Sequence, residues 1–487
     1  MPASRGPAWL PLLASLAIVA LAYFSPVEMV DSDPAIALLV SQAILDHQSL
    51  RLDPYRDDPR LAYDLDDDYR LRRRGDERFY YSPSVAVLSL PFVRLANHFG
   101  VHMLDQAAEY ALQNLLSALC CGAIFLLLHG ACRALLPPLP SLVISGISVL
   151  GSPLMSTVAS GLWNSGYAAL FTSLAVLHLA RRSAGEPAAA PNLVYLGAVL
   201  AAGFVARPAV AVAILALLIY LLGEADRRLR WLAGSGLAGI ALFVVLGWLD
   251  VLGWLLPIQV YYYSPTRLFT ETPLLEGLTG TLISPSRGLF VFCPFLVAVA
   301  AGVVWRIGDL RQQRLVRFAL IWLVLYAPAV ATRPVWWGGH SFGPRLYTEV
   351  LPAFVLLTGL LWRQLDGALS PRARSAAIAL YLALGAGAVA MHSGQALFNP
   401  YTRYWNERPN IDQNREYLFD WHHPQFLTTE ARFERRLIDH QRRRLRPYPF
   451  GKKLAYDSER ALFAGWSPPE NGWRWSREEK PSLGLRL

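Results

Sequence analysis

The sequence has few cysteines, and nothing in their placement suggests a use for them. Four Cys occur among 487 residues, each in or beside an apolar run, where a free thiol behaves as a small hydrophobe. This excludes a disulfide framework. Neither Cys nor His has the spacing of a zinc site, and no Ser, His and Asp are arranged as in a nucleophilic triad. We also find no internal repeat of the kind common in transporters.

Charge is missing from long stretches as well. Ala134 to Ala180 contains no Asp, Glu, Lys or Arg. At about 20 residues per span, this stretch holds two helices with a hinge near Ser152-Pro153 or Gly161. The hydrophobic share of 54% and the mean hydropathy of +0.30 are high for a soluble protein. We therefore expect an all-α polytopic membrane protein.

Further apolar runs bring the expected number of transmembrane helices to about eleven. Pro191–Leu222 is long enough for two short spans broken at Arg207-Pro208, because proline lacks a backbone donor. Together with 134–180, the runs are 10–24, 108–128, 191–222, 231–252, 288–305, 317–332, 346–362 and 375–392. Leu10–Phe24 reads as a retained anchor, because no small-residue cleavage site follows it.

The arginines set the expected orientation, because Lys and Arg stay on the cytoplasmic side of short loops. With eleven spans, the basic loops near 181, 227, 311 and 363–374 all fall on one side, together with the N-terminus. The other side then carries Val27–Gln106, Pro257–Ser286, Arg333–Arg345 and the tail after His392. The net charge of +9 is explained by these loops and an Arg-rich tail, so we expect anionic lipid rather than nucleic acid as a partner.

An acidic motif follows the first apolar run. Asp31 and Asp33 lie a few residues beyond the point where the chain leaves the lipid, where ionisable groups are costly and usually functional. Such a carboxylate can act as base, acid or metal ligand. Alternatively, the pair caps the N-terminus of an expected helix over Pro34–Leu45. One Asp can also cap the helix while the other acts as base, acid or metal ligand.

The acidic motif begins a loop of unusual length, Val27–Gln106, and loops this long tend to be functional. Pro34–Asp46 has helical spacing and is expected to lie on the membrane surface. Asp66-Asp67-Asp68 suggests a metal cluster, but the neighbouring arginines favour a solvated loop. After Phe79–Pro83, Ser84–Leu95 is expected to form a second short helix that returns to the bilayer.

Two other segments on the same side have the composition of ligand sites. Ser284–Gly288 combines hydroxyls with Arg287 at the start of a helix, a pattern that suits phosphate binding. Alternatively, the segment is a Pro-initiated helix whose Arg287 side chain reaches the lipid interface. Trp336–Arg345 holds two Trp, three Gly, His340 and Arg345. The Trp pair alone indicates an interfacial belt, but the glycines suggest a backbone that approaches a ligand closely.

In plan the chain resembles the GT-C superfamily of polytopic, polyprenyl-phosphate-sugar-dependent glycosyltransferases, within it the bacterial Rgt-type and protein-mannosyltransferase-like group. The resemblance is carried by elements spread over the chain to about residue 427, namely Asp31-Ser32-Asp33, Tyr81-Ser82-Pro83 with Leu90-Pro91-Phe92, Ser284–Gly288, Trp336–Arg345, Pro409–Asp412 and Asp420-Trp421. It implies a GT-C-like bundle over 1–392. The basic and aromatic tail over 393–487, which the span count places outside, continues well past the family-like segment and departs from a compact membrane enzyme.

The resemblance also implies a reaction and roles for these residues. A sugar on a polyprenyl phosphate would pass, with inversion, to the hydroxyl of a glycan, lipid or protein acceptor on the extracytoplasmic face of a bacterial inner membrane. Asp33 would be the base and Asp31 its partner, with the reverse assignment open. The donor's phosphate and sugar would be bound by Arg287, His340, Arg345, Ser286 and Tyr81. Some members use a divalent metal, Mg or Mn, which Asp31 or Asp33 would ligate; others use none.

Two other functional classes fit a polytopic chain with polar loops. A flippase or transporter of lipid-linked glycans would carry buried polar residues, but near the membrane midplane and between repeats, whereas here the polar clusters lie at one face. A non-catalytic assembly subunit would explain the loops, but not the combination of acidic, cationic and glycine-rich segments. In the tail, Arg432–Arg446 suits either anionic headgroups or solvent, and adjacent His422 and His423 suit a structural role.

Overall fold

The computed structural model of the chain describes residues 9–27, 34–56, 58, 61, 72–73, 76–77, 83–185, 193–223, 226–248 and 272–445. Asp31, Asp33 and Tyr81 lie outside these residues. So do Asp66 to Asp68 and the chain after residue 445.

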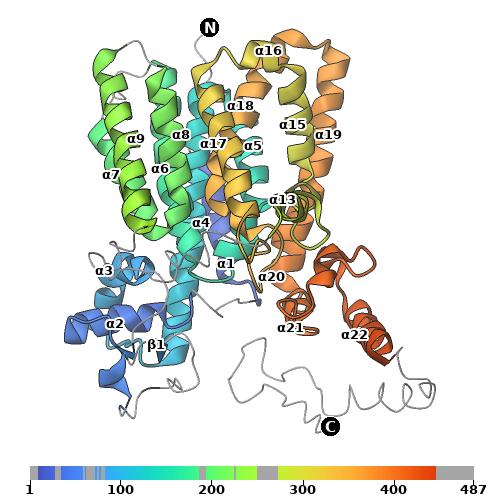
Figure 1. Ribbon diagram of the computed structural model, residues 1–487. Helices are drawn as coiled ribbons and strands as arrows, with labels where there is room; N and C mark the ends of the chain where they lie inside the picture. Colours follow the sequence, from blue (N-terminus) through green and yellow to red (C-terminus); the bar gives the residue numbers. More distant parts are fainter. Residues whose placement is uncertain are drawn as a thin grey trace.

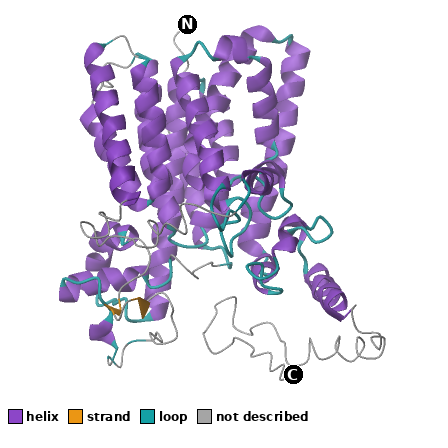
Figure 2. Ribbon diagram, in the orientation of Figure 1, coloured by secondary structure: helices purple, strands orange, loops and turns teal. Residues whose placement is uncertain are grey.

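Apolar helices form a bundle that makes up most of the described chain (Figures 1 and 2). Its first half consists of α1 (Trp9–Tyr23), α4 (Gln106–Leu135), α5 (Pro138–Leu150), α6 (Asn164–Ser183), α7 (Leu193–Ala206), α8 (Ala211–Leu222) and α9 (Arg227–Trp248). Its second half consists of α13 (Leu274–Ile283), α14 (Leu289–Phe292), α15 (Phe295–Trp305), α16 (Ile307–Leu310), α17 (Arg314–Ala331), α18 (Leu351–Ala368) and α19 (Pro371–Val389).

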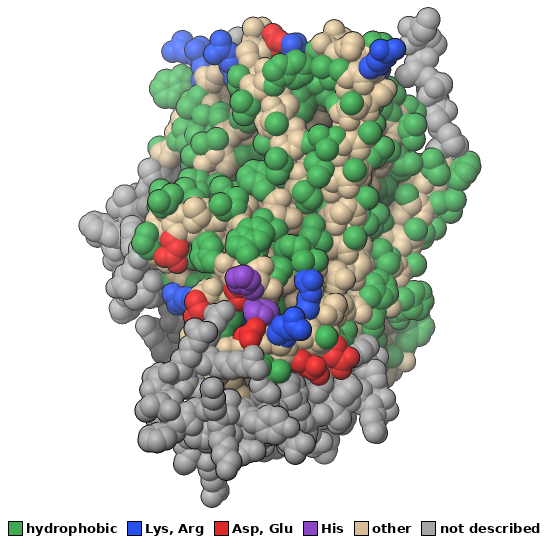
Figure 3. Space-filling view, turned by 90° about the vertical axis from the view of Figure 1, so that its right-hand side faces the viewer, with side chains coloured by type: hydrophobic (Ala, Val, Ile, Leu, Met, Phe, Trp, Pro, Cys, Tyr) green, Lys and Arg blue, Asp and Glu red, His purple; other side chains and the backbone are tan. Residues whose placement is uncertain are grey.

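The two ends of the bundle differ. The beginning of α1 and helix α16 lie at one end, and shorter elements gather at the other, which we call the loop end (Figure 1). These elements are α2 (Ala37–His47), η1 (Asp53–Tyr55), the hairpin β1 (Arg72–Arg73) and β2 (Asp76–Glu77), α3 (Ser84–His98), α20 (Ala396–Phe398), α21 (Tyr401–Glu407), η7 (Arg415–Phe419), η8 (Gln425–Leu427) and α22 (Glu430–Leu445). On the face in Figure 3, Lys and Arg side chains lie along the edge opposite the loop end and also beside Asp, Glu and His side chains near the loop end. The orientation in the membrane stays a prediction.

The predicted breaks within long apolar stretches are present. Helix α5 ends at Leu150, a π-helix covers Leu154–Val158, and α6 begins at Asn164. At the second break, α7 ends at Ala206 and α8 follows a 3-10 helix over Pro208–Val210. Ser84 Oγ of α3 donates to the Ala206 carbonyl at 3.2 Å, so this break lies at the loop end.

Four described helical segments are long and apolar enough to cross a membrane by themselves. They are Gln106–Leu135, Arg314–Ala331, Arg345–Leu365 and Pro371–Phe398, and six shorter apolar helices of 10–17 residues accompany them. A membrane protein is therefore indicated. The total of eleven crossings goes further than this finding and stays a prediction.

One continuous apolar cluster joins the bundle helices, and the four cysteines are buried free thiols. Gly122 lets α1 approach α4 closely, because a Cβ there would stand 2.6 Å from Val19 Cγ2. Across the same contact, Ser15 Oγ donates to the Gly122 carbonyl at 3.1 Å. Helix α1 is thus an integral member of the bundle.

Helix α2 packs inside the loop end. Its residues Ala37 to Ala43 are all buried, and Ser41 Oγ donates to the Ala86 carbonyl of α3 at 2.8 Å. The apolar residues that suggested a helix lying on the membrane surface are therefore covered by protein. Hydrophobic periodicity alone cannot distinguish a helix face covered by lipid from one covered by protein.

The chain beyond residue 392 is also part of the fold. Helix α19 continues through a π-helix, Ala390–Gln395, into α20, so the boundary placed at residue 392 falls inside one helical stretch. Further along, the Arg436 side chain of α22 is 1% exposed. Its guanidinium lies 4.0 Å from the ring centroid of Trp405 and donates to the carbonyls of Trp405 and Arg408.

Candidate functional site

The chain on both sides of the acidic motif is fixed at the loop end. Before the motif, the Val27 amide donates to the Leu397 carbonyl at 3.1 Å. After it, Gln113 Nε2 of α4 donates to the Pro34 carbonyl at 2.9 Å. Asp31 and Asp33 themselves lie outside the described residues. Their chain neighbours are thus tied to α20 on one side and to α4 on the other.

Glu109 of α4 caps helix α2. Its Oε1 accepts the amides of Leu38 and Leu39 at 3.0 and 3.4 Å, and the Glu109 side chain is completely buried. A carboxylate at a helix N-terminus also interacts favourably with the helix dipole. Two amide groups that the capping hypothesis assigned to the acidic motif are therefore satisfied by a residue that the sequence did not single out.

The Trp336–Arg345 segment, which we call the glycine loop, has a backbone that requires its glycines. Gly338, Gly339 and Gly343 have φ values of 74°, 69° and 63°, in the left-handed region that side chains disfavour. Trp336 and Trp337 are 2% exposed and pack with Trp405 in one apolar cluster. This burial rules out the interfacial belt that the Trp pair alone indicated.

Arg287 is the centre of a hydrogen-bond network beneath the glycine loop. Its guanidinium makes five hydrogen bonds: Nε with the Trp337 carbonyl, Nη1 with the Ser286 carbonyl and Gln425 Oε1, and Nη2 with the Gly339 carbonyl and Asn406 Oδ1, all at 2.6–3.1 Å. A guanidinium has five N–H donors, so protein acceptors match its full capacity. Burial lowers the pKa of Arg287 to about 9, against an opposing effect of Asp412, so the side chain remains a cation at neutral pH.

Gln425 and Asn406 bring the C-terminal segment into this network. Gln425 Oε1 also accepts the Gly343 amide at 3.2 Å, and its Nε2 donates to the carbonyls of Ser341 and Thr402 at 3.0 and 2.9 Å. Both side chains are completely buried. Residues far apart in sequence thus fix the glycine loop. Nothing in the sequence spacing of Asn406 or Gln425 could have revealed this role.

The other predicted donor ligands lie around this network. Ser286 is buried, and its Oγ donates to the Leu418 carbonyl at 2.9 Å. His340 is partly exposed, with Nε2 3.5 Å from Asp412 Oδ2, while Asp412 Oδ1 accepts the Trp337 indole N–H at 2.7 Å. Tyr81 lies outside the described residues; Pro83, two residues later, is the N-cap of α3.

Arg345 lies at the end of the glycine loop, against the beginning of α6. Its Cζ is 4.2 Å from the ring centroid of Trp163, the N-cap residue of α6. A guanidinium over an indole face is a favourable cation–π geometry. The structure thus joins Arg345 to a residue that the sequence analysis did not single out.

A buried ion pair lies one helical turn beyond Arg345. Arg207 Nε is 3.2 Å from Glu349 Oε1, which also accepts the Tyr326 hydroxyl at 2.6 Å. Arg207 lies in the break between α7 and α8, directly before the 3-10 helix Pro208–Val210. The pair therefore ties this break to the segment that carries Arg345.

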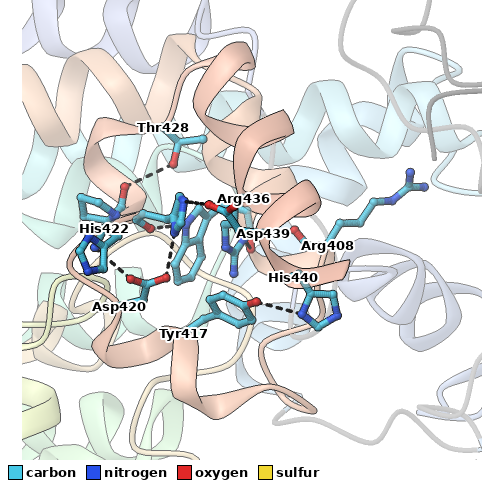
Figure 4. Close-up of polar contacts among 11 residues, drawn as sticks. Arg408, Tyr417, Asp420, His422, Thr428, Arg436, Asp439 and His440 are labelled. Carbon is cyan, nitrogen blue, oxygen red and sulfur yellow. Dashed lines mark hydrogen bonds and ion pairs between the residues drawn. The ribbon is translucent and has the colours of Figure 1, made fainter. Parts of the chain in front are cut away.

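Below the bundle, α22 is fastened to η7 by a second polar cluster (Figure 4). His423 Nδ1 and Nε2 lie 2.9 and 3.2 Å from carboxylate oxygens of Asp420 and Asp439, and Tyr417 Oη lies 2.9 Å from His440 Nδ1. Burial lowers the pKa of Arg436 to about 9. The cluster agrees with the structural role expected of His423.

No group of three or more His, Cys, Asp or Glu among the described residues is arranged to hold a metal ion. Asp31 and Asp33, the ligands suggested by the sequence, are outside that part of the chain. The hypothesis of a bound Mg or Mn ion therefore stays a prediction.

Comparisons with known proteins inform the fold. No protein-family model and no curated protein sequence matches the chain. The structure is similar to the Archaeoglobus fulgidus oligosaccharyltransferase in its apo form, with a TM-score of 0.50 and 12% identity over 88% of this chain and 62% of that one. The same enzyme tethered to an acceptor peptide containing the NVT sequon gives a TM-score of 0.48 at 12% identity, over 85% and 59% of the two chains.

The chain thus spans about three fifths of the length of the oligosaccharyltransferase whose fold it resembles. The similarity shows an oligosaccharyltransferase-like fold. It does not extend to the Rgt-type or protein-mannosyltransferase-like group suggested by the sequence.

Proposed function

We propose that this protein is an inverting glycosyltransferase of the GT-C type. It would move a sugar from a polyprenyl-phosphate donor to the hydroxyl of a glycan, lipid or protein acceptor. The reaction would take place at the loop end, on the extracytoplasmic face of a bacterial inner membrane, with the N-terminus in the cytoplasm. The oligosaccharyltransferase-like fold supports the reaction class. The acidic motif, whose flanking residues are fixed at the loop end, and the cations at that end support the chemistry.

One observation carries the proposal. Leu38, near the beginning of α2, packs in the same apolar cluster as Leu162. Leu162 directly precedes Trp163, on which the Arg345 guanidinium lies. The helix that follows the acidic motif and the cation of the glycine loop are therefore linked through Leu162 and Trp163, the two residues before α6. A base and a phosphate ligand are the two groups this transfer needs close together.

In the proposed reaction, Asp33 removes the proton from the acceptor hydroxyl. The hydroxyl oxygen attacks the anomeric carbon from the face opposite the phosphate and forms the new glycosidic bond. The bond between the anomeric carbon and the phosphate oxygen breaks, and its electron pair leaves with the polyprenyl phosphate. Arg345 and His340 stabilise the charge that develops on this leaving group. Asp31 orients Asp33 or holds a divalent metal, and Tyr81 contacts the donor.

Arg287 and Ser286 serve the site indirectly in this proposal. All five N–H donors of Arg287 have protein acceptors, and the Ser286 hydroxyl donates to the Leu418 carbonyl. Their hydrogen bonds hold the backbone of the glycine loop and the C-terminal segment in place. We therefore assign Arg287 as a positioning residue and Arg345 as the direct ligand of the donor.

A transfer assay tests this function. The full-length protein, purified in detergent, is incubated with labelled polyprenyl-phosphate sugars and candidate acceptors. We expect release of polyprenyl phosphate that depends on the acceptor and yields a product of inverted configuration. Movement of the intact lipid between the leaflets of a proteoliposome, without release of polyprenyl phosphate, would instead establish a flippase.

A further inference from the structure

The beginning of α6 holds polar groups that the hydrogen bonding of the fold does not use. Asn164 and Ser165 are 2% and 1% exposed. Asn164 Nδ2, Asn164 Oδ1 and Ser165 Oγ are buried without a hydrogen-bond partner, as is the indole N–H of the preceding Trp163. Buried polar groups are nearly always paired. Several orphaned atoms on three consecutive residues therefore call for an explanation.

The same three residues begin a helix that no side chain caps. Helix α6 is 20 residues long, and its N-cap residue Trp163 makes no side-chain cap hydrogen bond. The first amides of a helix lack acceptors within the helix, and the helix dipole concentrates positive potential around them. The Gly166 amide is bonded to the Trp163 carbonyl, which leaves the amides of Asn164 and Ser165 at the open turn.

The charge next to this turn is also positive. The Arg345 guanidinium lies over the Trp163 ring, on the residue that begins α6. Most of the polar groups at this turn are hydrogen-bond donors: backbone amides, a carboxamide, a hydroxyl, an indole N–H and a guanidinium. Such a set suits an anion with several acceptor oxygens better than a sugar, which presents donors as well as acceptors.

We propose that the N-terminus of α6 is a phosphate-binding site, with Asn164 and Ser165 as its uncharged ligands and Arg345 as its cation. This inference rests on the proposed function, and it assigns the phosphate of the polyprenyl donor to a defined helix end. Asn164 and Ser165 have no exposed polar atoms, so neighbouring side chains must move apart as the phosphate enters. Arg345, which is partly exposed, provides the entry from the loop end.

Direct binding tests the site without any transfer. Labelled polyprenyl phosphate, which carries no sugar, is bound to the full-length protein in detergent, with inorganic phosphate and polyprenol as competitors. Asn164→Ala and Ser165→Ala should each weaken binding of polyprenyl phosphate by about 10-fold, the effect of losing one charge-assisted hydrogen bond. Competition by inorganic phosphate would show that the phosphate group alone is recognised, whereas competition by polyprenol alone would overturn the site.

Two further variants separate binding from folding. Ser173→Ala is the matched control, because this buried serine lies on the same helix and its Oγ donates to the Ala169 carbonyl at 2.6 Å; binding should not change. Asn164→Asp places a carboxylate at the helix N-terminus, which favours the helix but repels phosphate. We expect it to abolish detectable phosphate binding while the melting temperature holds or rises. Wild-type affinity in Asn164→Asp and Ser165→Ala would mean that the orphaned atoms merely enclose water.

These outcomes are distinct from those of the transfer assay. If the wild type transfers sugar and the α6 variants bind polyprenyl phosphate normally, only the phosphate site is refuted. If the wild type binds polyprenyl phosphate through Asn164 and Ser165 but transfers no sugar, only the transferase function is refuted.

Discussion

The guanidinium of Arg345 lies on the indole of Trp163, with 4.2 Å between Cζ and the ring centroid. This places a cation of the glycine loop at the beginning of α6. Arg287, which has the same side chain and lies at the same end of the bundle, is instead enclosed by five hydrogen bonds. Two arginines to which the sequence assigned one role therefore differ in their surroundings.

Substitution of the two arginines should separate these roles. Arg345→Ala should weaken donor binding, because the substitution removes the cation proposed to contact the phosphate. Arg287→Ala should lower the stability as well, because its charge-assisted bonds to Asn406 and Gln425 are worth roughly 1.5–3 kcal/mol each. Thermal unfolding in detergent and binding of labelled polyprenyl phosphate measure the two effects. Arg345→Lys should restore only part of the binding, since Lys lacks the bidentate fork.

The contrast fails if Arg287→Ala unfolds at the wild-type temperature. In that case the network beneath the glycine loop contributes nothing to stability. Equal donor affinity in both alanine variants and the wild type would move the donor pocket elsewhere.

Asp33→Asn should fold and insert normally but lose turnover. The change keeps the size of the side chain and removes the basic oxygen, which commonly costs on the order of 10² to 10⁴ in rate. Donor affinity should change little if Asp33 contacts only the acceptor hydroxyl. Initial rates at saturating donor, with donor binding measured in parallel, test this. Transfer at the wild-type rate would leave Asp31 as the candidate base of this motif.

Asp31→Asn distinguishes the two roles left open for Asp31. Its rate should be measured with and without EDTA and with added Mg²⁺ or Mn²⁺. A mild loss that is insensitive to the added ion indicates an orienting partner. A severe loss with altered metal dependence indicates a ligand.

Gly343→Ala should destabilise the glycine loop more than Gly100→Ala destabilises the end of α3. Both residues have positive φ, 63° and 77°, and this backbone strain costs roughly 1–2 kcal/mol for a residue with a Cβ. Only at Gly343 would the new Cβ also stand 2.7 Å from Phe292; around Gly100 the space is open. Thermal unfolding compares the two, and equal losses would show that Phe292 moves aside without cost.

Labelling of introduced cysteines checks the orientation. The four native cysteines are buried, so background reaction should be low. Phe99→Cys, at a position that is 74% exposed at the end of α3, should react with an impermeant thiol reagent on intact cells. Arg311→Cys, beside α16 at the opposite end, should react only after permeabilisation. Reaction of Arg311→Cys on intact cells would reverse the orientation.

Apolar runs and breakers predicted most of the described bundle helices, but not α13, which lies within the expected loop Pro257–Ser286. The charge-free stretch 134–180 shows this well: its hinge residues predicted where α5 ends and α6 begins, because helix formation depends on near neighbours in sequence. The pattern of apolar residues could not show that α2 is buried inside the loop end. Whether lipid or protein covers an apolar face depends on distant segments, here α3 and α4.

The candidate site was predictable only in part, for the same reason. Arg345, His340 and the glycines stand out because their composition is unusual for an apolar chain. Asn164 and Ser165 do not stand out, since small polar residues are common at a hinge. Only the structure shows that their polar atoms are buried without hydrogen-bond partners. Nor could the sequence reveal that Asn406 and Gln425 would saturate Arg287.

The tether between Val27 and Leu397 has a consequence for the synthesis of the protein. Chains fold from the N-terminus as they leave the ribosome, so the acidic motif emerges long before the residue that anchors its near side. Gln425, which fastens Arg287 and the Gly343 amide, emerges later still. Most of the bundle can therefore be inserted while the anchors of the site are incomplete. A nascent chain stopped before residue 397 would already hold most of its apolar helices but not yet the anchors of the candidate site.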